Sequence, residues 1–498
     1  MLLESLGQML QNYLSIELWL IMILGVIIGL IFGIIPGLTG MVAIALLLPF
    51  IFMMTPERAL PLLMSITAVQ FMGGSMTAIL LSIPGTPPNA ATVIDGHTMA
   101  QKGEAGRAIG AALASSAAGS IVTPLIALAM IPLVLPMIMA IHTTDMVFII
   151  LMGVIFIGVL AGGSMIKGLI SGATGMLISL IGHQSLTGVE RFTFGILHLY
   201  EGFAIIPVAL GLFAIPEMVT LAAKGGTIAK TKVKFHGLEA LWSGAKDVIR
   251  HWALFLQSSI IGFISGLIPG VGASVATFIA YGHAKQISKH PDKFGTGIVE
   301  GVIAPESAND SKEAGALLTT LALGIPGSAV MALILAALIM LGIIPGPDML
   351  TTRLPLSLTL MSVILVASVI GAVICFILGP YLSRVAFIPT RLLVPVILAV
   401  VMCGAFVFRG LTFDIIVLLV FGSIGLAMKM YGYNRPALLL GFILGGLFEK
   451  WFFLGLKLGG PLFFLSPLSL ALIAIIIVSI VYRPLFSWFR RRKGAEKR

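Results

Sequence analysis

Charge is the scarcest property of this sequence. Only 10% of its 498 residues are Asp, Glu, Lys or Arg, whereas a soluble domain carries about 25%. Hydrophobic residues make up 58%, and the mean hydropathy is +1.11. Apolar runs of about 20 residues, long enough to cross the hydrocarbon core of a membrane, recur throughout. The composition therefore excludes a soluble globular protein and predicts an all-α polytopic membrane protein.

Patterns that carry enzyme chemistry are also missing. The two cysteines, Cys375 and Cys403, lie in apolar runs and have no spacing typical of a metal site or redox pair. The sequence has no His-Glu-x-x-His pair and no Gly-x4-Gly-Lys-Ser/Thr phosphate loop. The nearest histidines, His283 and His290, lie among lysines, as is typical of an interfacial or cytoplasmic loop. We therefore expect no enzyme activity, no ATP hydrolysis and no cofactor.

The net charge of +10 is unevenly distributed. Lys and Arg collect in residues 224–250 and in the last nine residues, which is a signal of membrane topology rather than of nucleic-acid binding. Both segments are predicted to be cytoplasmic. The N-terminus lacks the basic region and cleavage pattern of a removable signal peptide. Instead, its leucines recur at helical spacing from Leu2 to Leu14, which predicts a short helix on the lipid interface.

Glycine and proline, in contrast, are abundant and form a repeated pattern. The spacing Gly-x3-Gly-x2-Pro-Gly occurs at residues 29–37 and returns at residues 262–270, 233 residues later. Ile83-Pro84-Gly85 matches Ile325-Pro326-Gly327 at a shift of 242, and Gly211-Leu-Phe213 matches Gly446-Leu-Phe448 at a shift of 235. Three matches in one order and at nearly one shift predict an internal duplication.

Each Gly-rich copy is an apolar helix with a small-residue face that runs into Pro-Gly and cannot continue. Irregular backbone inside a membrane must be covered by protein or face a wet cavity, and paired breaks are typical of transporter sites. The alternative is a pair of Pro kinks used for packing. The stretch Gln70–Asn89, half apolar and half small or hydroxylated, is predicted to be a re-entrant hairpin.

The orientation of the copies follows from counting crossings. If residues 224–250 and the basic tail share one side, the segment 251–482 crosses an even number of times. One apolar span lies beyond the third match and is not part of the second repeat. Without it, the second repeat crosses the membrane an odd number of times. The two repeats then have opposite orientations in the membrane, which predicts two inverted repeats. The predicted organisation is an interfacial helix (1–15), a first repeat (16–223), a cytoplasmic loop (224–250), a second repeat (251–460), an extra transmembrane helix (461–483) and a cytoplasmic tail (484–498).

Ionisable residues accompany both Ile-Pro-Gly turns: Asp95 follows the first, and Glu306, Asp310, Lys312 and Glu313 precede the second. An ionisable group at membrane depth suggests function. The alternative is that both clusters lie in wet surface loops, of which the first also holds Lys102 and Glu104.

Hydroxyls, amides and free carbonyls beside the breaks suit a cation such as Na⁺, while free N–H groups at helix starts suit a carboxylate. A single Ser or Thr, however, more often bonds its own helix. The candidate substrate- and ion-binding residues are Gly37, Thr39, Gly40, Ser75, Thr77, Pro84, Gly85, Thr86, Asn89, Asp95, Gly270, Gly272, Ser274, Glu306, Ser307, Asn309, Asp310, Gly327 and Ser328. Any Na⁺ is expected near the same motifs.

A set of motifs resembles a known family. They are Gly33-x2-Pro36-Gly37-Leu38-Thr39, Gly73-Gly74-Ser75-x-Thr77, Ile83-Pro84-Gly85-Thr86, Asp95-Gly96-x2-Met99-Ala100-x2-Gly103, Arg191-Phe-Thr-Phe-Gly195, Pro305-Glu306-Ser-Ala-Asn309 and Leu323-Gly-Ile-Pro-Gly327-Ser328. Together they resemble the large transmembrane subunit of the tripartite tricarboxylate transporters.

This resemblance implies a bacterial inner-membrane permease that works with a small membrane subunit and a periplasmic solute-binding protein. It also implies import of carboxylates driven by a Na⁺ or H⁺ gradient. The chain departs from the family pattern after Asn309, where a second Asn and small residues are usual but Asp310-Ser311-Lys312-Glu313 stands. A single-subunit carrier or a channel for another small anion is the competing interpretation.

Overall fold

The computed structural model describes residues 2–35, 37–142, 144–160, 164–184, 187–224, 237–382 and 389–480. These residues are almost entirely helical, as predicted. They divide into two compact units, Met1–Leu135 with Ala204–Ala427, and Pro136–Phe203 with Met428–Arg498. The predicted site falls wholly in the first unit.

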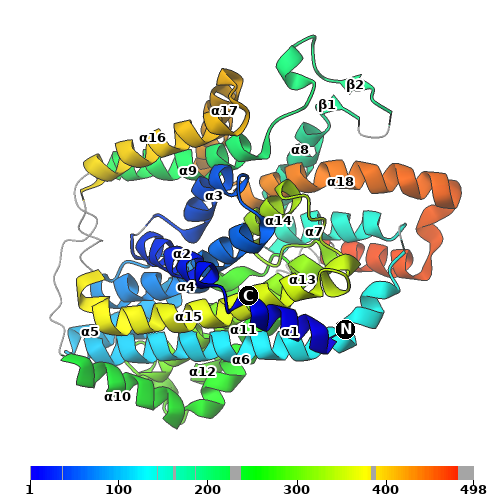
Figure 1. Ribbon diagram of the computed structural model, residues 1–498. Helices are drawn as coiled ribbons and strands as arrows, with labels where there is room; N and C mark the ends of the chain where they lie inside the picture. Colours follow the sequence, from blue (N-terminus) through cyan, green and yellow to red (C-terminus); the bar gives the residue numbers. More distant parts are fainter. Residues whose placement is uncertain are drawn as a thin grey trace, which may run out of the picture. The chain divides into compact units, whose positions relative to one another are not determined.

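The helices of the first half follow the predicted apolar runs (Figure 1). In chain order they are α1 (Leu2–Asn12), α2 (Ile16–Ile34), α3 (Gly40–Ile51), α4 (Pro56–Leu81), the 3-10 turn η1 (Pro87–Asn89), α5 (Ala90–Gln101), α6 (Ala105–Met139), α7 (Met146–Leu160), α8 (Met165–Ser179), the 3-10 turn η2 (Leu197–Leu199) and α9 (Ile205–Lys224).

The second half is also helical. Its elements are α10 (Gly237–Arg250), α11 (Trp252–Leu267), α12 (Gly272–Ile287), η3 (Pro291–Lys293), α13 (Glu300–Leu323), α14 (Ala329–Met340), η4 (Pro347–Leu350), α15 (Leu354–Leu382), α16 (Thr390–Arg409), α17 (Thr412–Tyr431), α18 (Arg435–Gly459), η6 (Gly460–Leu465) and a last helix, Pro467–Ile480.

The predicted duplication is visible in the packing of two helix pairs. A methyl group at Gly33 of α2 would lie 2.1 Å from the carbonyl oxygen of Gln70 in α4. At the matching position of α11, a methyl group at Gly266 would lie 2.0 Å from the carbonyl oxygen of Lys312 in α13. Glycine is required at both places because any side chain would overlap the facing backbone. The pairs α2–α4 and α11–α13 therefore pack in the same register.

The predicted helix breaks have similar backbone geometry in the two halves of the chain. Gly37 and Gly270, in the links after α2 and α11, have φ of +92° and +83°, which glycine tolerates and other residues rarely adopt. The central helices α4 and α13 both end in a left-handed residue, Ser82 with φ 56° and Gly324 with φ 68°. Pro36 itself lies outside the described residues. The third sequence match is not accompanied by equivalent contacts, since Gly211 packs against α17 whereas a Cβ at Gly446 would meet nothing within 4 Å.

Two predicted boundaries are corrected. The segment Gln70–Leu81 is the second half of the continuous 26-residue helix α4 rather than one arm of a short hairpin. Its glycines do not break the helix because they pack against α2. In addition, the predicted loop 224–250 is helical from Gly237 to Arg250, and this helix bends by 80° into α11. The predicted orientation depends on residues 225–236 and 481–498, which lie outside the described ranges.

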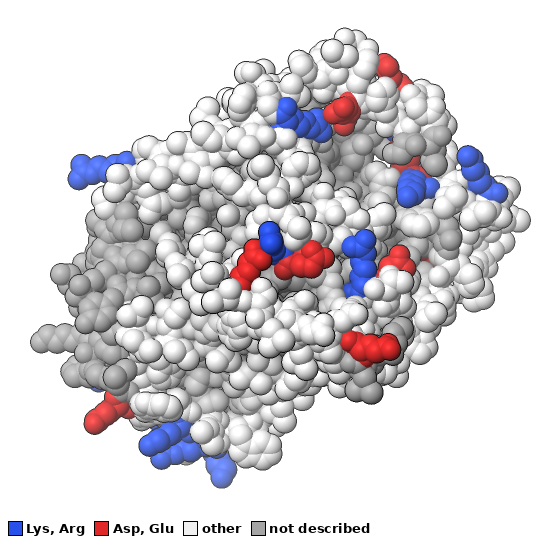
Figure 2. Space-filling model, viewed as in Figure 1, with Lys and Arg blue, Asp and Glu red and all other residues white. Residues whose placement is uncertain are grey.

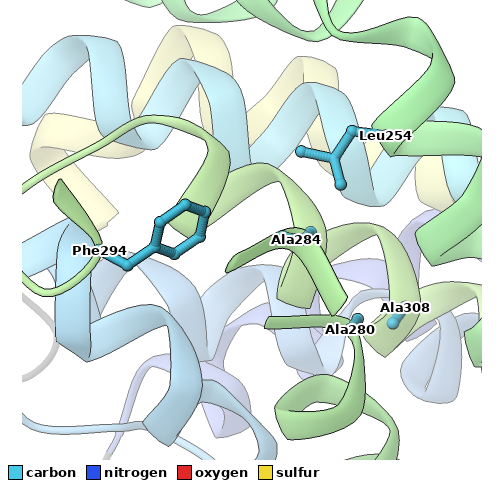
Figure 3. Packing of buried hydrophobic residues seen from close by; sticks show 6 residues of the cluster. Leu254, Ala280, Ala284, Phe294 and Ala308 are labelled. Atoms are coloured by element: carbon cyan, nitrogen blue, oxygen red, sulfur yellow. The ribbon is translucent and has the colours of Figure 1, made fainter. Parts of the chain in front are cut away.

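Small residues let the helices of the second repeat approach closely. A buried cluster joins Leu254 of α11, Ala280 and Ala284 of α12, and Ala308 of α13 (Figure 3). Phe294, in the link between α12 and α13, also belongs to it. The small alanine side chains leave little space between α12 and α13. This packing holds α13, which carries most of the predicted ionisable residues.

Within the described ranges, eight helices are long and apolar enough to cross a membrane, or nine if the bent pair α10–α11 forms one span. Figure 2 shows a molecular face on which Lys, Arg, Asp and Glu are few. The helix α4 differs from the other seven because its apolar window is wholly buried inside the protein. A long, buried and only moderately apolar helix is typical of the centre of a polytopic membrane protein.

The second unit is built around α8 and α18, which touch through glycines such as Gly175 and Gly441. Between α8 and α9, the strands β1 (Gly182–His183) and β2 (Glu190–Arg191) form an antiparallel pair with Gly182 opposite Arg191. Arg191 forms a bidentate ion pair with Glu449 of α18, at 2.5 and 2.8 Å. This pair fixes the hairpin to α18.

Candidate functional site

The central helix α13 carries an unusual run of buried polar residues. It begins at Glu300 and continues through a stretch rich in helix-forming Ala and Glu until Gly324 ends it. The side chains of its polar run are at most 1% exposed: Glu306, Asn309, Asp310, Lys312 and Glu313. Because burying a charge is costly unless it is paired, each of these groups needs a partner or a ligand.

The carboxylate of Glu306 is the best-bonded group in this run. Its Oε2 accepts hydrogen bonds from the hydroxyls of Ser75, at 2.7 Å, and Ser116, at 3.1 Å. Its Oε1 accepts from the hydroxyl of Thr92 and, at 3.4 Å, from the amide of Asn89. These four donors come from α4, η1, α5 and α6, so the first repeat surrounds a carboxylate that the second repeat supplies.

The same network holds the turn after α4. The amide nitrogen of Asn89 also donates to the Ser75 hydroxyl, at 2.8 Å, and to the carbonyl of Phe71, at 3.1 Å. Its amide oxygen accepts from the hydroxyl of Thr86. The structure thus brings together four predicted residues, Ser75, Thr86, Asn89 and Glu306. We call them, with Thr92 and Ser116, the Glu306 group.

Sequence reasoning missed Thr92 and Ser116. Thr92 lies one helical turn after Asn89, so the face of α5 that carries Asn89 indicates it. Ser116 lies in the stretch Ser115-Ser116-Ala-Ala-Gly119-Ser120, an interruption of small polar residues in an otherwise apolar run. Such an interruption is a usable signal, because a buried apolar helix gains nothing from hydroxyls that lack partners.

The Glu306 group surrounds a carboxylate with three hydroxyls and one amide, and no described Lys, Arg or His forms an ion pair with it. Ser75 lies within reach of two acceptors, Glu306 and, at 2.8 Å, the carbonyl of Phe71. A hydroxyl has one hydrogen, so it can donate to only one of them at a time. The arrangement therefore accommodates Glu306 either as a carboxylate or with a bound proton, and its oxygens suit a hard cation.

The buried lysine of α13 already has a partner. Lys312 Nζ lies 2.5 Å from Oε1 of Glu313 and 5.3 Å from the ring centroid of Phe71. These two contacts give the ammonium group a counter-ion and an aromatic face. The charge of Lys312 is thus compensated locally, and Glu306 and Asp310 remain as two buried carboxyl groups without a basic partner among the described side chains.

Asp95 is buried but its carboxylate is fully occupied. It accepts hydrogen bonds from the backbone N–H groups of Gly295, Gly297 and Ile298, at 2.7 to 3.1 Å, and from the hydroxyl of Tyr281 at 2.8 Å. Lys102 and Glu104 are exposed, as the surface-loop interpretation predicts for them. Asp95 itself ties α5 to the segment before α13, and none of its partners belongs to the Glu306 group.

Most other predicted residues shape or pack the breaks. Gly85 and Gly327 occupy matching positions, where a Cβ would lie 2.3 and 2.4 Å from the carbonyl oxygens of Gly33 and Gly266. The Thr77 and Ser307 hydroxyls donate to carbonyls of their own helices, and Ser328 caps α14 by accepting from Met331 N at 3.2 Å.

The remaining candidates line the links around the first break of each repeat or the turn after α4, and none hydrogen-bonds to Glu306. Gly40 N donates to the side-chain oxygen of Gln70 at 3.0 Å, which ties the start of α3 to α4. The others are Gly37, Thr39, Pro84, Gly270, Gly272 and Ser274, of which the three glycines have positive φ. Among the described residues, no group of three or more His, Cys, Asp or Glu is arranged to hold a metal ion.

Comparison with known proteins identifies relatives over most of the chain. An uncharacterised 52.8 kDa protein from the TAR-I ttuC′ 3′ region of Agrobacterium vitis is 34% identical over 427 residues, covering 86% of this chain and 84% of that protein. An uncharacterised protein from the TAR-II ttuC′ 3′ region of the same organism is 35% identical over 189 residues, covering 38% of this chain and 78% of that protein. No solved structure matches the chain.

The family model that matches is described as the tripartite tricarboxylate transporter TctA family, and it covers residues 19–440. The matched region contains both repeats' central helices, both breaks and the whole Glu306 group. With its apolar helices, its duplicated scaffold and this match, the chain belongs to the tripartite tricarboxylate transporter TctA family.

Proposed function

We propose that this protein is the permease subunit of a binding-protein-dependent secondary transporter that imports tricarboxylates or other organic carboxylates together with Na⁺ or H⁺. It works in the bacterial inner membrane with a small membrane subunit and a periplasmic solute-binding protein, and its C-terminus is cytoplasmic. The observation that carries the proposal is the contact of Glu306 in one repeat with four polar side chains of the other.

In this proposal Glu306 takes up the coupling cation. A buried carboxylate without a basic partner is neutralised most economically by a proton or by a bound cation. Since its hydrogen bonds join α13 to α4, α5 and α6, a change in its charge changes the attraction between the two repeats. Loading and release of the cation then accompany the movement that exposes the site to one side of the membrane or the other.

The carboxylate substrate binds between the paired Pro-Gly and Ile-Pro-Gly breaks. Both Ile-Pro-Gly turns lead into a helix: α14 starts two residues after Gly327, and α5 starts after Gly85, Thr86 and the 3-10 turn η1. The N-terminal end of a helix presents unpaired N–H groups and partial positive charge, which favours a carboxylate. The inverted arrangement of the two repeats would direct these two helix starts toward one central site.

A single-subunit carrier, or a channel for another small anion, is the alternative. A channel needs no coupling cation, so the buried Glu306 group favours a coupled transporter over it. The membership of a tripartite family favours the need for partners over a single-subunit carrier.

Uptake measurements test the proposal. The chain should be expressed with its two predicted partners in cells that lack carboxylate uptake, and radiolabelled citrate, malate and acetate should be offered separately. We expect accumulation of at least one carboxylate, collapse of that accumulation when the Na⁺ and H⁺ gradients are both abolished, and little uptake when the binding protein is omitted. Rapid, saturable uptake by the purified chain alone would contradict the tripartite assignment and support the single-subunit carrier.

A further inference from the structure

Beside the Glu306 group lies a second set of buried polar side chains, and these lack partners. Among the described residues, both carboxylate oxygens of Asp310 and both polar atoms of the Asn309 amide have no hydrogen-bond partner. The same is true of hydroxyls from three helices: Ser115 and Ser120 of α6, Ser258 and Ser259 of α11, and Ser311 of α13. Buried polar groups are normally satisfied, so a concentration of exceptions indicates a missing ligand.

Several of these oxygens face one point on α6. A Cβ added at Gly119 would lie 2.5 Å from Ser311 Oγ, 3.0 Å from the carbonyl oxygen of Ser307 and 3.6 Å from Ser259 Oγ. Because Gly119 has no side chain, oxygens of α11 and α13 approach this point of α6 closely. This convergence is independent of the acidic character of α13.

The charge of this set is negative. Asp310 is 1% exposed, and the carboxyl groups of Glu306 and Glu313 act on it electrostatically, as does the ammonium of Lys312. Lys312, however, is paired with Glu313 at 2.5 Å. Ser116 is a neighbour of Asp310 as well as a donor to Glu306, although its contact with Asp310 lacks hydrogen-bond geometry. A second carboxylate so close to Glu306 disfavours an anion and favours a cation.

We propose that Asp310 and Ser311, together with the serines of α6 and α11 around Gly119, form a Na⁺ site distinct from the Glu306 group. The proposal rests on the coupled-transport function above and names the ion and its place. One carboxylate, several hydroxyls and a main-chain carbonyl are the hard oxygen ligands that such a cation takes. Binding would satisfy the unpartnered oxygens and compensate the charge of Asp310 in one step.

Cation binding by the purified full-length chain in lipid nanodiscs tests this site without any transported substrate. Thermal unfolding should be followed while NaCl replaces choline chloride at constant ionic strength and at fixed pH. We expect Na⁺ to raise the Tm with a saturable dependence. In Asp310→Asn, the concentration for half of the effect should rise by about tenfold or more, because the variant loses the charged ligand.

Two pairs of variants distinguish the loss of a Na⁺ ligand from general destabilisation of the protein. Asp292→Asn makes the same chemical change at an exposed position and should retain the wild-type Na⁺ response. Gly119→Ala places a methyl group among the proposed ligands without altering charge and should weaken the response, whereas Gly371→Ala creates a similar overlap, with Val69 of α4 at 2.6 Å, and should not. If Asp310→Asn does not fold, Ser311→Ala provides the same test with a smaller change.

Two outcomes would overturn the proposal. If Na⁺ has no effect but acidification stabilises the protein and Asp310→Asn abolishes that effect, Asp310 takes a proton. If the Na⁺ response is unchanged in Asp310→Asn, Ser311→Ala and Gly119→Ala, the ion binds elsewhere. The transport function and the Na⁺ site can be contradicted independently. Carboxylate uptake driven by a pH gradient alone would support the transport function and contradict the Na⁺ site. Na⁺ binding without any carboxylate uptake would support the Na⁺ site and contradict the transport function.

Discussion

The two central helices, α4 and α13, make matching glycine contacts but differ in their chemistry. At a shift of 242 residues, Gln70 of α4 corresponds to Lys312 of α13. The carbonyl oxygen of Gln70 would lie 2.1 Å from a Cβ at Gly33, and that of Lys312 would lie 2.0 Å from a Cβ at Gly266. The neighbouring positions diverge: Met64, Thr67, Ala68 and Val69 of α4 correspond to Glu306, Asn309, Asp310 and Ser311 of α13. The matching backbone contacts are therefore retained, while at these four positions the ionisable and amide side chains are found only in α13.

The space proposed for Na⁺ illustrates this divergence at a single pair of contacts. In the second repeat, α13 presents Ser311 Oγ to Gly119 of α6. The matching contact in the first repeat joins Val69 of α4 to Gly371 of α15, where a Cβ would lie 2.6 Å from Val69 Cγ1. An apolar pair therefore stands where the other repeat has oxygens. The proposed ligands are therefore found at one of these two contacts only, and the matching contact does not form an equivalent site.

The largest effect is expected at Glu306. Glu306→Gln retains the size of the side chain but removes its charge, so uptake by the assembled transporter should fall by about 30-fold to several-thousand-fold. Met64→Leu changes the corresponding residue of α4, which is buried and apolar, and should have little effect. Uptake at equal expression measures both, and a comparable loss in the two variants would show that the two helices do not differ in function.

Removing polar groups next to the breaks should have the next largest effect. Ser75→Ala removes a hydrogen bond to a carboxylate, typically about 1.5 to 3 kcal/mol, or roughly 10- to 150-fold in affinity. Its control is Thr77→Ala, because the Thr77 hydroxyl donates to the carbonyl of Gly74 in its own helix. The raised cation or substrate requirement should appear in Ser75→Ala alone. Normal ion dependence in this variant would indicate that the cavity lies elsewhere.

A corresponding pair compares the repeats at one position. Asn309→Ala removes an amide whose two polar atoms are buried and unpartnered, whereas Thr67→Ala at the matching position removes a hydroxyl that donates to Leu63 of the same helix at 2.9 Å. We expect Asn309→Ala to raise the cation concentration needed for uptake by about tenfold, and Thr67→Ala to leave it close to normal. A larger effect in Thr67→Ala than in Asn309→Ala would indicate that α4, rather than α13, contributes to cation binding at this position.

The packing glycines should respond alike in both repeats. Gly33→Ala and Gly266→Ala each force a methyl group against a backbone carbonyl and should destabilise the protein by about 1 to 3 kcal/mol or more. Thermal unfolding of the purified variants, with Gly282→Ala as the control in open space, measures this. A large effect at only one of the two glycines would mean that the equivalent contacts are not equivalent in energy.

The smallest effects are expected at Lys102 and Lys289, which are exposed. Replacing either by Ala should change stability by no more than about 0.5 kcal/mol, since exposed residues away from special features rarely contribute more. Uptake should also remain near normal. A strong transport defect in either variant, at normal expression, would reveal a functional surface that the buried groups do not account for.

The sequence predicted the fold well because its strongest signals are local. Glycine spacing and Pro-Gly breaks determine where a helix can pack or must end, so the ends of α2, α4, α11 and α13 were accessible from the sequence. The partners of Glu306 were only partly accessible, because Thr92 and Ser116 reach it through packing between distant segments. Asp95 shows the same limit: its sequence position suggested either ligand binding or a wet loop, and its partners, Gly295, Gly297, Ile298 and Tyr281, are about 200 residues away.

The exchange of contacts between repeats has a consequence for biosynthesis. Helix α4 is wholly buried, and the carbonyl of Ala68 accepts a hydrogen bond from Ser368 of α15, 300 residues later in the chain. During translation, α4 must therefore wait in the membrane or the insertion machinery until most of the chain has been made. A nascent chain that stops before Leu354 would leave one side of α4 without its permanent neighbour, and such truncated chains should be preferred targets for membrane proteases.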